Sequence, residues 1–259
     1  MCLLIVLIII IITTAAGVFT SLHPSAAAER SPEVQEIIDR VDRLYRSDTS
    51  YGEIEMTIIT PDWRRTLRMK IWTEGMDKTF LYITSPKKDA GIATLRIGSE
   101  MWNYFPKINK VMKVPPSMMM GSWMGSDFTN DDLVKESSLL RDYSARLINP
   151  EGADKAHYYI ELIPKRDTPS VWGKIIVTVR KDDYIPVRLV YFDEKGRKMR
   201  VMEYKDIRMF GDRKLPAVLE MTPLNKKGHK TVIRYLDVRF NIKPDRETFT
   251  LRNLQRKRR

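Results

Sequence analysis

Along most of the chain, apolar and polar residues alternate in short segments that are separated by turn residues. A period of two places successive side chains on opposite faces of a strand. In the first half of the chain this pattern predicts strands over residues 51–60, 63–73, 77–84 and 91–97. The Gly, Pro, Asp and Ser residues between them are typical of an antiparallel meander.

The second half of the chain repeats this pattern. It predicts further strands over residues 142–148, 157–164, 171–180, 186–192, 198–210, 215–221 and 230–240. Both faces of the last strand are mixed, which is compatible with a sheet whose outer side is partly covered. One domain is enough for an all-β chain of this length. We therefore predict a mainly β fold with a few helices, built on an antiparallel sheet.

A helix is predicted before the first strand. Ser31 suits its N-cap, Pro32 suits its first helical position, and Glu33 adds an acidic side chain to its first turn. Apolar residues then recur at three- and four-residue spacing and form one face, which consists of Val34, Ile37, Ile38, Val41, Leu44 and Tyr45. The other face mixes acidic and basic residues, so we expect this helix to pack on the sheet.

The regular pattern stops within residues 101–133. Short strands are predicted over residues 101–105 and 111–114, and two prolines follow the second. Residues 117–128, the Met-rich loop, show neither strand nor helix period, yet they contain four Met, one Trp and one Phe. Loops are normally polar because they run over the surface, so this loop must bury part of itself.

Methionine is informative because its flexible, polarizable side chain fits irregular apolar shapes and repacks around different partners. Three interpretations of the Met-rich loop stay open at this point. The loop fills the core of its own domain, lines an adaptable apolar pocket, or contacts another protein.

The residues of this region resemble the outer-membrane lipoprotein-sorting proteins of the LolA-like superfamily. The resemblance lies in W-x-Y-x-P followed by K-V, then S-x-M-G-S-D-F and D-D-L. It is carried by Trp102, Tyr104, Pro106, Lys110, Val111, Ser122, Met124, Gly125, Ser126, Asp127, Phe128, Asp132 and Leu133. It implies a curved antiparallel half-barrel whose helices and loops close an apolar cavity for acyl chains. The individual lipid contacts of the better-known lipoprotein carrier do not transfer, because these motifs do not align with it residue by residue.

Within this resemblance, we predict that the apolar residues of the region line the cavity and its lid. The predicted ligand-binding residues are Trp102, Tyr104, Phe105, Met118, Met119, Met120, Trp123, Met124 and Phe128. A lid of this composition suits a container that must also release its load.

Residues 1–28 read as a secretory signal peptide. They contain no Lys, Arg, Asp or Glu, and an apolar run is followed by small residues that end at Ala28. We expect cleavage after Ala28, delivery to the periplasm, and a single mature domain over residues 29–259. No basic residue follows Met1, so an uncleaved inner-membrane anchor is the alternative. Cys2 is the only cysteine, so the mature chain forms no disulfide and depends on its core.

The formal net charge is +12, and five basic residues concentrate in the tail over residues 252–259. A basic patch suits nucleic acid, anionic lipid or an acidic partner. The expected export of the chain and the absence of a nucleic-acid-binding motif disfavour nucleic acid as the partner. We expect Arg256, Lys257, Arg258 and Arg259 either to be a solvated tail or to contact anionic head groups or an acidic protein.

Candidates for catalysis are few. His157 and His229 of the mature chain lie in no metal-spaced cluster, and the sequence holds no nucleophile elbow, P-loop or dinucleotide fingerprint. Asp127, Asp131 and Asp132 suit helix capping better than a cation, because no glycine-bearing calcium loop accompanies them. We therefore expect no catalytic residues, no metal and no cofactor.

Carriage explains the sequence better than catalysis. Burying a methylene is worth about 0.8 kcal/mol, so a long acyl chain in water needs a container. We expect a monomeric carrier of acyl chains of lipoproteins or phospholipids, with peripheral membrane contact and with an inner-membrane transporter or outer-membrane acceptor as partner. The alternatives are a non-catalytic periplasmic adaptor or envelope-sensing module, and an accessory to a membrane lipid transporter.

Overall fold

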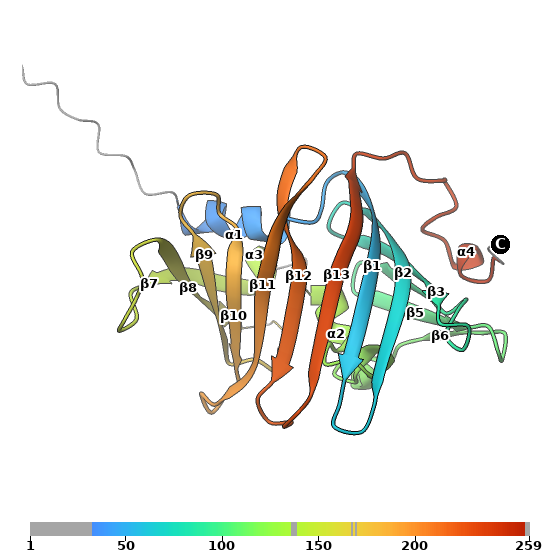
Figure 1. Cartoon of the computed structure of the whole chain (residues 1–259), viewed down its shortest axis with the longest axis horizontal. Coiled ribbons are helices and arrows are strands. Elements are labelled where there is room, and N and C mark those ends of the chain that lie inside the picture. The colour runs from blue at the N-terminus through green and yellow to red at the C-terminus, as the bar shows by residue number, and fades with distance from the viewer. Residues whose placement is uncertain (1–32, 136–138, 167, 169, 257–259) are drawn as a thin grey trace, which may run out of the picture. The chain divides into compact units, whose positions relative to one another are not determined.

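The structure is a computed structural model that describes residues 33–135, 139–166, 168 and 170–256. The predicted signal peptide and Lys257, Arg258 and Arg259 lie outside these ranges. Thirteen strands form one antiparallel sheet in the order β6-β5-β4-β3-β2-β1-β13-β12-β11-β10-β9-β8-β7 (Figure 1). The mainly β fold class is therefore confirmed.

The strands lie close to where alternation predicts them. Their bounds are β1 Thr49–Ile59, β2 Arg64–Glu74, β3 Lys78–Ser85, β4 Ala93–Ile97, β5 Glu100–Phe105, β6 Lys110–Lys113, β7 Tyr143–Ile148, β8 His157–Pro164, β9 Lys174–Arg180, β10 Pro186–Phe192, β11 Lys198–Phe210, β12 Arg213–Pro223 and β13 Lys230–Phe240. Four of them, β8, β10, β11 and β13, begin and end at the predicted residues.

Two meanders make up the sheet, and they meet in its middle because β1 pairs with β13. The ends of the sheet curl back behind these central strands, and α2 (Asn130–Lys135) and α3 (Leu139–Asp142) lie on the hollow side (Figure 1). Such curling follows from the twist that neighbouring strands impose on one another. The curved half-barrel that the resemblance implies is thus present.

Helix α1 spans Val34–Asp42 and packs its apolar face on the hollow side of the sheet. Ile37 and Ile38 are fully buried there. The predicted start was too early by two residues. Glu33 is the N-cap, and its extended backbone (φ −62°, ψ 140°) keeps the chain outside the helix until Val34.

The hydrophobic core has three parts. On the hollow side, α1 covers β8 to β12, whereas the Met-rich loop covers β1 to β5 through Trp123. Alternation sends Phe80 of β3 to the opposite side and Leu81 to the hollow side. A third cluster therefore forms on the outer side, around Phe80, Leu95 and Tyr104.

The C-terminal segment covers this third cluster. Residues Leu251–Leu254 form α4, which is capped by the Thr250 side chain, and Leu254 is 1% exposed. Within the basic segment from residue 252, Asn253 and Leu254 are thus buried, whereas Arg252 and Arg256 are exposed. The single buried leucine of α4, Leu254, packs this short segment on the cluster. The basic residues around Leu254 made the segment look polar in the sequence. None of the helices in the described ranges is long and apolar enough to cross a membrane.

Candidate functional site

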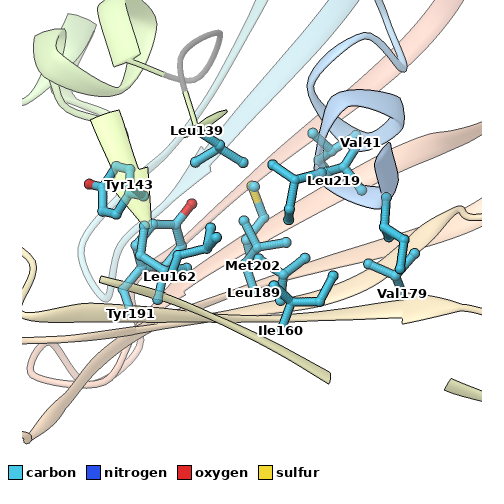
Figure 2. Packing of buried hydrophobic residues seen from close by; sticks show 14 of the residues in the cluster. Val41, Leu139, Tyr143, Ile160, Leu162, Val179, Leu189, Tyr191, Met202 and Leu219 are labelled. Atoms are coloured by element: carbon cyan, nitrogen blue, oxygen red, sulfur yellow. The ribbon is translucent and has the colours of Figure 1, made fainter. Parts of the chain in front are cut away.

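The central cavity lies on the hollow side, between the three helices α1 to α3 and the middle of the sheet, and it has a volume of about 140 Å³. Val41 of α1 and Leu139 of α3 face Met202 on the sheet, as Figure 2 shows. Its aliphatic, methionine and phenylalanine wall consists of Val41, Leu44, Ile71, Phe128, Leu139, Ile175, Leu189, Met202, Met221 and Val238. This lining suits an apolar ligand.

The rest of the apolar wall is aromatic. It consists of Tyr45, Tyr51, Tyr143, Trp172, Tyr191, Tyr204 and Tyr235. The rings of Tyr45 and Tyr235 stack with centroids 4.5 Å apart. The Tyr45 hydroxyl donates to Pro216 O at 2.7 Å, and Tyr143 shares a 3.0 Å hydrogen bond with Ser170. Because these hydroxyls have protein partners, the rings can face apolar groups without a desolvation cost.

Gly52 makes room for the cavity. It lies in the interior of β1 between Ile71 of β2 and Val238 of β13, its cross-strand partners. A Cβ at this position would lie 3.1 Å from Ile71 Cγ2. Glycine inside a strand often marks such a place, where the space beside the backbone is used. Ile71 Cγ2 already packs against the position that a side chain would take, so a larger residue here would crowd this wall of the central cavity.

Asp132 makes one corner of the central cavity charged, and its partner Arg200 lines the neighbouring side groove. Arg200 of β11 donates to both carboxylate oxygens of Asp132 at the start of α2, at 2.7 and 2.5 Å. The guanidinium also lies over the rings of Trp172 and Tyr191, at 4.3 and 4.1 Å from their centroids. Burial alone lowers the pKa of Arg200, but the charge and hydrogen bonds of Asp132 raise it above its ordinary value. The Arg200 guanidinium therefore stays charged, and its hydrogen bonds to Asp132 tie α2 to the sheet.

Of the three acidic residues predicted to cap this helix, Asp132 does so. Thr129 Oγ1 accepts from the Asp132 N–H at 3.1 Å, and Asp132 Oδ2 accepts from the Thr129 N–H at 2.7 Å. These reciprocal bonds are those of a capping box. Asp127 instead accepts from the Thr231 hydroxyl at 2.8 Å and thereby fastens the Met-rich loop to β13. Within the described ranges, no cluster of three or more His, Cys, Asp and Glu side chains is placed to hold a metal ion.

A second hollow, the side groove, has a volume of about 210 Å³ and lies beside the Met-rich loop. Met120 borders it on one side, and Asn225 and Lys226 of the turn between β12 and β13 border it on the other. Phe128 and Trp172 line both the side groove and the central cavity. These two rings therefore form part of the partition between the two hollows.

The predicted ligand-binding residues of the Met-rich loop fall into separate places. Phe128 lines the central cavity, and Met120 lines the side groove. Trp123 is 1% exposed and fills the core over β1 to β5, with Met124 packed beside it. Met118 is 59% exposed. Met119 is partly buried, and its carbonyl accepts from Asp131 N at 2.7 Å.

The predicted residues of β5 lie apart from both hollows. Trp102 and Tyr104 pack in the outer cluster with Leu254. Phe105 is half-buried at the end of the strand. Among the nine residues, Phe128 alone lines the central cavity. The tyrosines that dominate the cavity were not identified from the sequence, because they come from the turn after α1, from β11 and β13, and from other elements far apart in the chain.

Comparisons with known proteins agree with this architecture. A protein-family profile described as "Uncharacterized protein" matches residues 75–256. No functionally curated protein matches the sequence. Among solved structures, a DUF1329 family protein from Desulfovibrio piger is 21% identical, with a TM-score of 0.75 over 85% of this chain and 97% of that one.

Two further structures are similar. A domain assigned as an outer membrane lipoprotein-sorting protein, from Vibrio parahaemolyticus, is 21% identical, with a TM-score of 0.73 over 86% of this chain and 98% of that one. A LolA superfamily protein from Nitrosomonas europaea is 19% identical, with a TM-score of 0.71 over 84% and 98%. The chain therefore belongs to the family of uncharacterized proteins whose profile it matches, and its fold is that of the LolA superfamily.

Proposed function

We propose that this protein is a non-catalytic carrier that holds acyl chains of a lipoprotein or lipid in its central cavity. The observation that carries the proposal is the cavity itself, with its apolar and aromatic wall on the hollow side of a LolA-like sheet. We further propose that the chain is exported and works in the periplasm, moving cargo toward the outer membrane. The apolar run before Ala28 and the sorting proteins that share the fold support this.

The cavity explains why such a protein would bind acyl chains. Each methylene transferred from water to an apolar site contributes about 0.8 kcal/mol, and a mature chain in the periplasm meets lipid-modified cargo in an aqueous space. Burial raises the pKa of the Tyr143 hydroxyl, as expected for a group in the apolar surroundings of this cavity. A transporter in the inner membrane and an acceptor in the outer membrane are the proposed sites of loading and release.

The size of the cavity sets a condition on this function. A cavity of about 150 Å³ holds a molecule the size of benzene, and pockets for larger ligands measure about 300–1,000 Å³. At about 140 Å³, the central cavity as it stands accepts only the end of an acyl chain. Loading therefore requires the helices on the hollow side to move outward, or the flexible side chains of Met202 and Met221 to repack.

The test is to purify the exported protein gently from its native envelope, extract it with organic solvent and identify bound lipid by mass spectrometry. We expect an acyl lipid or lipopeptide in a stoichiometric amount. The purified protein should also bind a fluorescent fatty acid, and unlabelled palmitate should displace it. Absence of lipid together with a tightly bound protein would favour the adaptor interpretation and contradict carriage.

A cavity-filling variant localises the binding. Met202→Trp adds bulk beside Leu139, and overpacking costs about 1–3 kcal/mol, which a folded domain of this size tolerates. We expect it to lose most fatty-acid binding while its circular dichroism stays that of the wild type. Met209→Trp on the same strand is the matched control, because Met209 is 62% exposed. Equal binding by both variants would place the ligand outside the central cavity.

A further inference from the structure

Exposed apolar side chains gather on loops at one end of the sheet. Trp63 in the turn between β1 and β2 is 45% exposed, and Leu224 in the turn between β12 and β13 is 49% exposed. Met118 and Met120 of the Met-rich loop are 59% and 39% exposed. Both turns lie at the lower end of the sheet in Figure 1, where β1 and β12 end.

These loops form one continuous surface. A Cβ at Gly228 in one turn would lie 3.1 Å from Pro61 Cγ in the other, so the two turns touch. The guanidinium of Arg65 lies 5.7 Å from the centroid of the Trp63 ring and donates to the carbonyl of Met124 in the Met-rich loop. The side groove brings Met120 and Lys226 together. We name Trp63, Met118, Met120, Leu224, Lys226 and Lys227 the loop-end surface.

The charge on this surface is positive. The turn over residues 224–229 carries exposed Lys226 and Lys227 and no acidic residue. The neighbouring turn between β10 and β11 carries exposed Lys195, Arg197 and Lys198 against exposed Glu194 and half-buried Asp193, so its net charge is also positive. Anionic phospholipids attract such lysines, and tryptophan prefers the boundary between water and hydrocarbon.

A bilayer fits this composition better than a protein partner does. Protein interfaces are depleted of lysine and have a fully buried apolar centre. Here the apolar side chains stand on separate loops with lysines among them, so each can enter the head-group region while the ammonium groups meet phosphates. Amphipathic surfaces that lie in the membrane interface have this arrangement.

We propose that the loop-end surface docks the protein on an anionic phospholipid bilayer. Docking itself does not require carriage, but it extends the proposed function by naming the surface at which cargo is exchanged. The side groove opens within this surface and shares Phe128 and Trp172 with the central cavity. In the docked protein, Phe128 and Trp172, which lie between the side groove and the central cavity, would therefore lie close to the lipid.

The test uses the mature chain and sedimentation with vesicles of phosphatidylcholine, either alone or mixed with phosphatidylglycerol. We expect binding to the anionic vesicles only. Lys226→Gln/Lys227→Gln should lower the partition coefficient about 30-fold, which corresponds to about 1 kcal/mol for each lysine near an anionic surface. Trp63→Ser/Leu224→Ser should lower binding as well, and the weaker binding that remains should be abolished by salt. All four side chains are exposed, so the variants should keep the wild-type melting temperature.

Arg252→Gln/Arg256→Gln is the matched control, because it removes the same charge from the exposed C-terminal segment. Loss of binding in this control, with none in the lysine variant, would assign docking to the tail and overturn the proposal. Binding that requires native membrane proteins in the vesicles would overturn it in favour of a protein partner. Bound lipid in the same preparations is measured separately by mass spectrometry, so failure of docking and failure of carriage remain distinguishable.

Discussion

Removing the Arg200 side chain tests whether the ion pair with Asp132 holds α2 on the sheet. The side chains of Arg200 and Asp132 are only 5% and 14% exposed, so Arg200→Met would leave a largely buried carboxylate without its cation. Breaking a buried pair in this way costs about 3–5 kcal/mol. In a domain of this size each kcal/mol lowers the melting temperature by about 2–4 °C. The expected fall is therefore about 6–20 °C.

Urea unfolding followed by circular dichroism and tryptophan fluorescence measures the loss of free energy of unfolding, and thermal unfolding measures the fall in melting temperature. Arg208→Met is the matched control on the same strand, since Arg208 pairs with Asp206 at the surface with a side chain that is 62% exposed. Exposed pairs contribute at most about 1 kcal/mol. Adding Asp132→Asn to Arg200→Met removes the unpaired charge and keeps an acceptor for the Thr129 N–H, so part of the stability should return. The reasoning is refuted if Arg200→Met and Arg208→Met destabilise the protein equally.

Three further outcomes follow from the structure. Thr129→Ala removes the cap of α2 and should lower the free energy of unfolding by about 1 kcal/mol in urea titrations. Trp123→Ala should cost about 3–5 kcal/mol because it opens the core under the Met-rich loop, whereas Met120→Ala at the surface should stay within about 0.5 kcal/mol in the same assay. Burial raises the pKa of Glu161, but hydrogen bonds from Arg146 and Lys174 outweigh it and hold the pKa below its ordinary value of 4.5. The wild type should therefore gain stability from this carboxylate above about pH 4.5 and lose it as the pH falls through the lowered pKa. Urea midpoints between pH 6 and pH 3, roughly the range over which such groups titrate, should fall less in Glu161→Gln, and parallel curves would contradict this.

The strands were predictable because their signal is local. Short runs rich in β-branched and aromatic residues define β8 and β13 without reference to the rest of the chain, and turn residues end them. The capping box of Thr129 and Asp132 is equally local. Leu254 was missed because its burial depends on a cluster that β3, β4 and β5 build far away in the sequence.

The candidate site was less predictable for the same reason. Tyr45, Tyr204 and Tyr235 come together only because β1 pairs with β13 and α1 crosses the hollow side, and neither fact is visible in a local pattern. Gly52 was the one local indication of the cavity, because a glycine within a strand often marks a place where another group lies close to the backbone. The composition of the Met-rich loop correctly indicated burial, which Trp123 fulfils. The role of its other residues in ligand binding stays a prediction.

The pairing of β1 with β13 also governs the order in which the chain can fold. Ile59 and Lys230 are partners although almost the whole sheet separates them in sequence. Closing so long a loop is slow, and contacts between distant residues lower folding rates. The middle of the sheet can therefore be completed only once the final strand has been synthesised.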